Sequence, residues 1–357
     1  MDLAVTNRAI ELVNQGLTQL RPYLDDPSVT EIMVNRHDSV FVERAGQMQH
    51  LDLRLGEEKV LALIRRLGKL AGKDVEPNTV NAIVDSRFDG MRVAGVLAPT
   101  AFNGHCICIR RHSTSVFGLA SYVESGRMDL TDPEGTVAAA SLTPPPMGEV
   151  AKGGAGLQSF LTWLIKSKQN FLVVGSTGSG KTALLNSMIA EMDDDARVLT
   201  IEDTHELIVN LSNVVILESN EQAGITSRLL VKLALRFRPD RILMGEVRGA
   251  EAFDLMRAVN SGHRGCFATL HANSAADAMG ALEKMILTAG VDWPLSSIRQ
   301  DIANAFPYVI FAERRAKRSG VISEVARIDG VDPNTGRYNV HEIFKRRNYY
   351  DSLAIAA

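Results

Sequence analysis

The stretch FLVVGSTGSGKTALLNSMI, residues 171–189, carries the strongest chemical signal in the chain. Its Gly175, Gly180, Lys181 and Thr182 fit the pattern GxxxxGK[ST], and they lie between an apolar strand-like run and a helical pattern, which is the context that the motif requires. Glycines let the backbone curl so that several N–H groups point at phosphate oxygens, and the following helix adds its positive N-terminal end. We therefore expect a nucleoside triphosphate as ligand. ATP is favoured over GTP because we find no NKxD stretch that would specify guanine.

Two residues of this loop have particular tasks. We expect the ammonium of Lys181 to reach the β- and γ-phosphates, and the hydroxyl of Thr182 to complete the coordination shell of Mg²⁺. The residues expected to bind ATP are Gly175, Ser176, Thr177, Gly178, Ser179, Gly180, Lys181 and Thr182.

Acidic residues follow two of the later apolar runs. RILMGEVRG contains a strand-like run that ends at Glu246, and a carboxylate at the carboxyl end of a parallel strand can orient an attacking water. VLTIEDTHEL ends another run with Glu202 and Asp203, and adjacent carboxylates there can hold Mg²⁺ through water. We predict Glu246 and Glu202 as catalytic residues, and Asp203 with Thr182 as the metal site. The plainer interpretation of each stretch is a solvated strand end or a helix cap.

Two of the eight histidines lie close together, in SGHRGCFATLHANSA, residues 261–275. A zinc site is disfavoured for His263 and His271 because no third or fourth ligand stands at zinc spacing. A structural role and a role in the nucleotide site both stay open from the residues alone.

The elements that must position these residues alternate between strand and helix. Strand-like runs at 170–175, 197–203, 214–219, 241–247 and 266–272 are separated by helical patterns at 182–192, 228–237, 250–262 and 276–287. This alternation predicts a mostly parallel sheet covered by helices, an α/β fold. The first 120 residues mix short alternating strands with helical patterns and predict a smaller α+β domain. We expect domains at 1–120 and 157–357, joined by a proline- and glycine-rich linker at 121–156.

Composition limits the function classes. A length of 357 residues favours two domains, and 45% hydrophobic with 23% charged residues is typical of a soluble globular protein. The net charge of -3 gives no general attraction to nucleic acid or anionic lipid. We find no apolar run long enough to span a membrane and no signal-peptide pattern, so we expect a cytoplasmic protein. Three cysteines without paired spacing predict buried free thiols.

Four stretches taken together resemble the secretion and traffic ATPase family, which drives type II and type IV secretion, type IV pili and conjugation. GSTGSGKT, TIEDTHEL, LALRFRPDRILMGEVRGAEA and SGHRGCFATLHANSA look like its Walker A, Asp box, Walker B and His box, in the family's order. The resemblance implies a RecA-like P-loop ATPase domain and a homohexameric ring at the cytoplasmic face of the inner membrane. It also implies inner-membrane secretion or conjugation proteins as partners.

The resemblance assigns further residues. His271 matches the His box histidine that senses the terminal phosphate, and His263 matches a second position of that box. Family members also supply arginines to the nucleotide from the N-terminal domain. The segments GMRVAGVLAP and CICIRRHS look like the corresponding ones, which nominates Arg92, Arg110 and, after them, Arg111. Arg236, Arg238 and Arg248 are second-rank candidates, and solvated surface is the plainer interpretation of each arginine.

The branch of the family and the rival functions stay open at this point. The lack of a CxxC…CxxC insert, the compact length and a closing β-hairpin look most like the conjugal transfer ATPases, with pilus retraction ATPases as near neighbours. A nucleic-acid translocase on the same core would call for a basic or aromatic channel, yet aromatic residues make up only 6% of the chain. A regulatory ring subunit that binds nucleotide without turnover is the second rival. The amphipathic opening NRAIELVNQGLTQL could lie on lipid, but covering its own domain is favoured because it has few basic residues.

Overall fold

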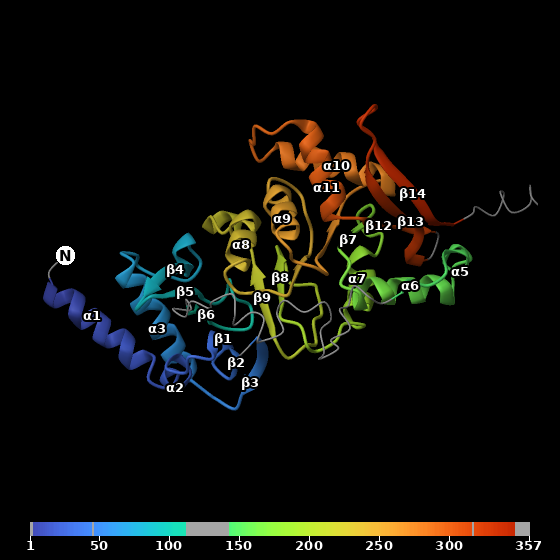
Figure 1. Cartoon of the computed structure of the whole chain (residues 1–357). Helices are drawn as coiled ribbons and strands as arrows, with labels where there is room; N and C mark the ends of the chain where they lie inside the picture. Colours follow the sequence, from blue (N-terminus) through green and yellow to red (C-terminus); the bar gives the residue numbers. More distant parts are fainter. Residues whose placement is uncertain (1–2, 45, 112–142, 316–317, 347–357) are drawn as a thin grey trace, which may run out of the picture. The chain divides into compact units, whose positions relative to one another are not determined.

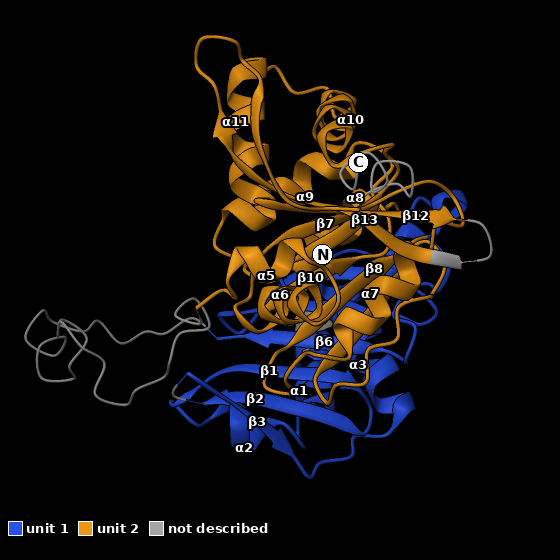
Figure 2. Cartoon of the chain, turned by 90° about the vertical axis from the view of Figure 1, so that its right-hand side faces the viewer, with its two compact units in different colours: residues 1–141, 220–225, 236–238 blue, residues 142–219, 226–235, 239–357 orange. Residues whose placement is uncertain are grey.

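The computed structural model describes residues 3–44, 46–111, 143–315 and 318–346 (Figure 1). The chain divides into two compact units, coloured separately in Figure 2. Unit 1 consists of Met1–Ser141, Asn220–Ile225 and Arg236–Arg238, and unit 2 consists of Leu142–Ser219, Thr226–Leu235 and Pro239–Ala357. Two short segments from the later chain therefore belong to the first unit.

Unit 1 is built on an antiparallel sheet with the strand order β3-β2-β1-β6-β5-β4. The strands are β1 Val29–Arg36, β2 Ser39–Arg44, β3 Gln47–Leu51, β4 Ile83–Phe88, β5 Met91–Val96 and β6 Cys106–Arg110. Four of them, β1, β2, β5 and β6, coincide with the alternating runs EIMVN, SVFVER, MRVAGVLAP and CICIRR of the sequence. The mixture of this sheet with helices confirms the expected α+β character of the first part of the chain.

The helices of unit 1 are α1 Leu3–Gly16, α2 Arg21–Leu24 and α3 Glu57–Leu70. Along α3, Val60, Leu63, Ile64 and Leu67 are buried, which is the spacing of one helix face. A guanidinium nitrogen of Arg66 on α3 donates to the carbonyl oxygen of a residue within α1, at 2.8 Å. The amphipathic opening helix therefore packs on its own unit. Among the described residues, no helix is both long enough and apolar enough to cross a membrane.

Unit 2 is built on a sheet with the strand order β14-β13-β12-β7-β11-β10-β8-β9. The strands are β7 Phe171–Val174, β8 Val198–Glu202, β9 Val214–Glu218, β10 Arg241–Met244, β11 Phe267–Leu270, β12 Tyr308–Arg315, β13 Arg318–Val331 and β14 Tyr338–Lys345. The six strands from β12 to β9 run parallel, and β13 and β14 extend the sheet as an antiparallel hairpin. The predicted parallel sheet and closing hairpin are both confirmed.

Helices cover both faces of this sheet. They are α5 Met147–Ala151, α6 Ala155–Lys166, α7 Lys181–Ile189, α8 Ser227–Ala234, α9 Glu251–Asn260, α10 Ala275–Leu287 and α11 Leu295–Ala305. The crossover from β7 to β8 moves across the sheet in one direction and the crossover from β10 to β11 moves in the other. Because parallel crossovers are right-handed, α7 and α9 lie on opposite faces. The strands between them are buried on both sides, which explains their continuous apolar runs.

Part of the expected linker is helical. Residues 121–142 lie outside the described residues, but α5 occupies 147–151 and α6 begins at Ala155. Pro146 stands immediately before α5, where its missing N–H is not needed, and Gly153 and Gly154 join the two helices with positive φ angles of 76° and 58°. The prolines and glycines of this stretch therefore lie at helix ends, and they do not exclude helices from it.

Candidate active site

The phosphate loop follows β7 and leads directly into α7. Gly178 and Gly180 have φ angles of 70° and 88°, which favour glycine. Gly175 is required for a different reason, because a Cβ atom there would lie 2.1 Å from the carbonyl oxygen of Ala312. The N-cap of α7 is Gly180, which has no side chain to cap the helix. The first N–H groups of α7 are thus left for a ligand, as anion binding at a helix N-terminus requires.

The ammonium of Lys181 points back over the loop. Its Nζ donates to the carbonyl oxygens of Gly175 at 3.0 Å and Ser176 at 3.1 Å. The residue is only 8% exposed, and this burial lowers the pKa of the ammonium, while the negative charge of Glu246 acts in the opposite direction. A buried cation beside the N-terminal end of α7 is suited to bind phosphate oxygens.

The carboxyl ends of four adjacent strands bring the remaining predicted residues together. The order β7-β11-β10-β8 places the phosphate loop, His271, Glu246 and the Glu202–Asp203 pair side by side at one edge of the sheet. They line one cavity of about 580 Å³. The lining residues from the predicted set are Thr177, Gly178, Ser179, Gly180, Lys181, Thr182, Glu202, Asp203, Glu246 and His271.

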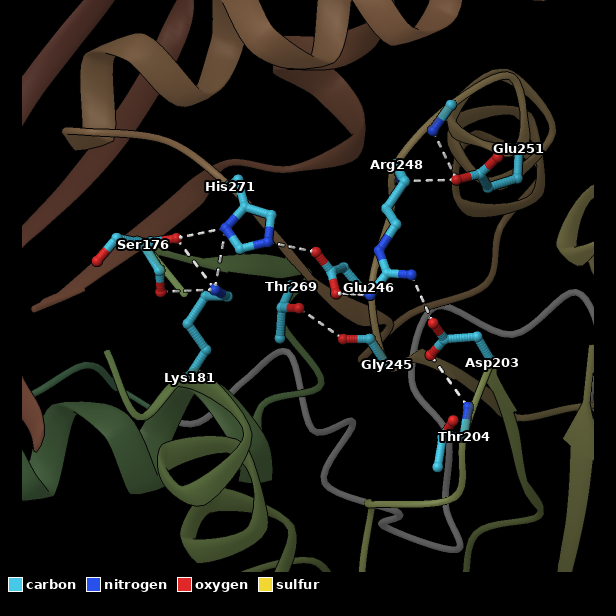
Figure 3. Close-up of polar contacts among 12 residues, drawn as sticks. Ser176, Lys181, Asp203, Thr204, Gly245, Glu246, Arg248, Glu251, Thr269 and His271 are labelled. Carbon is cyan, nitrogen blue, oxygen red and sulfur yellow. Dashed lines mark hydrogen bonds and ion pairs between the residues drawn. The ribbon is translucent and has the colours of Figure 1, made fainter. Parts of the chain in front are cut away.

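A line of polar contacts crosses this cavity (Figure 3). His271 Nδ1 lies 3.1 Å from the carbonyl oxygen of Gly175, and Nε2 lies 2.7 Å from Glu246 Oε1. The guanidinium of Arg248 donates to the other Glu246 oxygen at 2.6 Å and to Asp203 Oδ2 at 2.5 Å. The line therefore joins the phosphate loop to the predicted base and to the predicted metal ligand.

Glu202 has a different environment from its neighbour. Its side chain is buried, and Oε1 accepts the backbone N–H groups of Glu206 and Leu207, both at 2.9 Å. Its other oxygen, Oε2, lies 3.1 Å from Nδ1 of His205. Asp203, in contrast, is half exposed in the cavity. These contacts hold the loop after β8, and because Glu202 also lines the cavity, its catalytic role stays a prediction.

His263 lies away from the cavity. It precedes β11, whereas His271 follows it, so the strand separates them by about 13 Å of extended chain. Its Nδ1 lies 2.9 Å from the carbonyl oxygen of Ala258, near the C-terminal end of α9. The structure therefore favours the structural role for His263 and the nucleotide-site role for His271.

Arg92 and Arg110 lie next to each other on the sheet of unit 1. They are cross-strand partners on β5 and β6, and Arg87 on β4 is the partner of Arg92 on its other side. Directly opposed side chains share one face, so the three guanidinium groups form a row. Arg110 pairs with the buried Glu31 at 3.0 Å, and Arg92 pairs with Asp85 at 3.5 Å. Arg87 was not among the arginines predicted from the sequence, and its place in this row follows from the register of the β4–β5 hairpin.

The second-rank arginines separate into two groups. Arg236 and Arg238 belong to unit 1, where Arg236 pairs with Asp85 and Arg238 forms a two-point contact with Glu43 at 2.9 and 2.8 Å. Arg248 lines the cavity of unit 2. Of these three arginines, Arg248 is the one that lies in the same cavity as the predicted site residues.

The donors present fit Mg²⁺ only together with nucleotide phosphates. The cavity holds the hydroxyl of Thr182 and the carboxylate of Asp203, which are oxygen ligands of the kind that Mg²⁺ prefers. Within the described ranges, no group of three or more His, Cys, Asp or Glu side chains could hold a metal alone. Mg²⁺ is commonly bound by one or two protein oxygens, waters and substrate phosphates, and this cavity matches that pattern.

Comparisons with known proteins agree with this site. Residues 148–348 match the family described as type II/IV secretion system protein. The chain is 31% identical over 350 residues to the type IV secretion system protein VirB11 of Brucella suis, with 94% of each chain covered. It is 32% identical over 322 residues to the conjugal transfer protein TrbB of Rhizobium radiobacter, with 88% of each covered.

A solved structure supports the fold. The crystal structure of the VirB11 ATPase from the Brucella suis type IV secretion system, in complex with sulphate, is similar with a TM-score of 0.80 and 29% identity. The likeness covers 94% of this chain and 98% of that chain. It confirms the predicted fold class, with an N-terminal domain followed by a larger RecA-like domain.

Proposed function

Because the chain belongs to the type II/IV secretion system protein family, we propose that it is a Mg²⁺-dependent motor that hydrolyses ATP to ADP and phosphate. The energy of this hydrolysis would power a type IV secretion or conjugative transfer apparatus. The names of relatives that match nearly the whole chain, VirB11 and TrbB, support this branch over pilus retraction. The observation that carries the ATPase part is the single cavity that joins the phosphate loop to Glu246 and His271.

The phosphates are held by the loop and the start of α7. The N–H groups of residues 175–182 and the ammonium of Lys181 supply positive charge to the β- and γ-phosphates. The Lys181 ammonium exchanges its contacts with the carbonyl oxygens of the loop for phosphate oxygens. When bound, Mg²⁺ would neutralise charge on the phosphates, with Thr182 and Asp203 as its ligands, directly or through water.

Glu246 is the residue that orients the attacking water and accepts its proton. Its side chain is mostly buried at the end of β10, and His271 holds one of its oxygens. The same histidine contacts the phosphate loop through Gly175. His271 therefore gives the base a fixed place relative to the phosphates, which is how it would sense the terminal phosphate.

Two arginines of unit 1 are part of the proposal. We assign Arg92 and Arg110 as additional nucleotide contacts, because the transferred phosphoryl group needs positive charge from beyond the phosphate loop.

The proposal also includes an assembly and its partners. We assign a homohexameric ring that is peripheral to the cytoplasmic face of the inner membrane and works with proteins of the secretion or conjugation machinery. The family relationship is the support for the ring and its location.

The test is steady-state phosphate release from ATP, with and without Mg²⁺. We expect Mg²⁺-dependent turnover in the wild type and a loss of about 10²- to 10⁴-fold in Glu246→Gln, because the general base is removed. Glu342→Gln is the matched control, since it makes the same change in an exposed side chain that does not line the cavity.

Binding and assembly must be followed in the same preparations. Glu246→Gln should still bind a non-hydrolysable triphosphate and sediment as a hexamer-sized species. A wild type that binds ATP without turning it over would contradict the motor and favour a regulatory ring subunit. Turnover that survives in Glu246→Gln would contradict only the assignment of the base.

A further inference from the structure

Arg248 is placed between the two carboxylates on which the proposed reaction depends. One guanidinium nitrogen lies 2.5 Å from Asp203 Oδ2 and the other lies 2.6 Å from Glu246 Oε2 (Figure 3). The backbone at this point is fixed, because the N–H groups of Arg248 and Gly249 donate to Glu251 Oε1 at 2.6 and 2.7 Å. The start of α9 therefore holds the arginine at the cavity, where its guanidinium can contact both carboxylates at once.

Both carboxylate oxygens of Glu246 face a neighbouring side chain. Oε1 is next to His271 and Oε2 is next to Arg248. A base that orients water must accept a hydrogen bond from that water. Asp203 faces the same arginine through Oδ2, while Oδ1 accepts the backbone N–H of Thr204 at 3.0 Å. Arg248 and Mg²⁺ are therefore two cations that the same carboxylates can hold.

Arg248 is the partner of Glu246 that can leave. Nδ1 of His271 lies within the phosphate loop, 3.1 Å from the carbonyl oxygen of Gly175 and 3.4 Å from Nζ of Lys181. The side chain of Arg248, in contrast, is 61% exposed, and solvent-exposed ion pairs are weak.

We propose that Arg248 is a positioning residue that holds Asp203 and Glu246 through its two ion pairs and is displaced when Mg²⁺ and the triphosphate bind. Arg248 and Mg²⁺ then compete for the same negative charge. The competition makes both carboxylates available only when metal and nucleotide are present together. This inference rests on the proposed function, and it adds a residue that controls when the site becomes competent.

The test is the Mg²⁺ dependence of binding of a fluorescent, non-hydrolysable triphosphate analogue. In Arg248→Ala, we expect half-maximal binding at a Mg²⁺ concentration about two- to fivefold lower than in the wild type, the size expected for losing exposed ion pairs. Affinity at saturating Mg²⁺ should be unchanged or higher. The Mg²⁺ concentration for half-maximal binding in Arg248→Lys should lie between the values for the wild type and Arg248→Ala, because an ammonium lacks the two-point fork of the guanidinium.

Two controls isolate the effect. Arg327→Ala removes an arginine of similar exposure that pairs with Asp329 and does not line the cavity, so its Mg²⁺ midpoint should equal that of the wild type. The double variant Asp203→Asn with Arg248→Ala should not show the lower Mg²⁺ midpoint of Arg248→Ala, because the side chain at position 203 is then uncharged.

Three results would overturn the proposal. An unchanged or higher Mg²⁺ midpoint in Arg248→Ala would show that the arginine does not compete with the metal. Weaker binding of the analogue at saturating Mg²⁺ would show that Arg248 contacts the nucleotide instead. If the wild type binds no triphosphate at any Mg²⁺ concentration, the proposed function fails as well, whereas the first two results leave it intact.

Discussion

Nε2 of His271 lies 2.7 Å from Oε1 of Glu246, while Nδ1 of the same ring lies 3.1 Å from the carbonyl oxygen of Gly175. The imidazole therefore connects the phosphate loop to the proposed base. The two residues are 25 positions apart in the sequence and meet because β11, which ends before His271, lies between β7 and β10 in the sheet. A change at the phosphates can reach Glu246 through this one ring.

Removing the His271 ring should lower turnover more than binding. We expect His271→Ala to reduce phosphate release by about 10- to 100-fold, less than the loss of about 10²- to 10⁴-fold expected for the base itself, because Glu246 remains but is no longer oriented. The affinity for a non-hydrolysable triphosphate should change little. His263→Ala is the matched control, since that histidine lies at the other end of β11 and should leave turnover near the wild-type value. Equal losses in the two variants would contradict the assignment.

Nucleotide affinity should depend on alkaline pH through Lys181. Burial lowers the pKa of this ammonium below its ordinary value of 10.5 in the nucleotide-free protein. Bound phosphates add negative charge, which favours the protonated form, so binding takes up a proton between the two pKa values. Triphosphate affinity should therefore fall as the pH rises toward 10.5. Lys181→Arg keeps its charge in this range and should show a flatter profile; the same slope in both proteins would assign the pH dependence to another group.

Glu202 should be needed for stability as well as for activity. Glu202→Ala leaves the N–H groups of Glu206 and Leu207 without their acceptor, and an unsatisfied buried group costs about 1–3 kcal/mol. We expect the free energy of unfolding in urea to fall by about 2–4 kcal/mol, with faster amide exchange at residues 203–207. Glu206→Ala removes an exposed carboxylate in the same loop and should cost much less. Comparable losses in both variants would show that the loop does not depend on Glu202.

The buried carboxyl group of Glu31, which pairs with the exposed Arg110, should make the stability of unit 1 depend on pH. Burial raises the pKa of Glu31 above 4.5, and the charge of Arg110 acts against that rise. The folded state therefore binds more protons than the unfolded chain just above pH 4.5, so the free energy of unfolding decreases as the pH rises through this window. Arg110→Ala should steepen the decrease because the opposing charge is lost.

Glu31→Gln provides the check on that slope. It removes the titrating group, so the decrease should become shallower in Glu31→Gln and stay shallow in the double variant with Arg110→Ala. Urea unfolding at a series of pH values measures both. A steep decrease that persists in Glu31→Gln would mean that another carboxylate causes it.

Much of unit 2 could be predicted from the sequence because its strands are buried on both faces. Such strands appear as continuous apolar runs, and the first polar residues after them, including Glu246 and His271, mark the carboxyl edge of the sheet. The short helix α5 and the start of α6 were missed. Their sequence is dominated by Pro146, Gly153 and Gly154, which stand at helix ends, and local composition does not distinguish a helix end from a linker.

The sequence by itself determined which chemical groups the protein has and the local shape that presents them. The glycines around Lys181 specify the phosphate loop because their spacing sets the backbone angles within a few residues. Only the tertiary structure decided which contacts each carboxylate makes. Glu202 and Asp203 are neighbours of the same chemical type, yet the chain that turns back after β8 donates its N–H groups to the first, and the start of α9 presents Arg248 to the second. Such contacts depend on the lateral order of strands and the packing of helices, and a local sequence pattern does not contain that information.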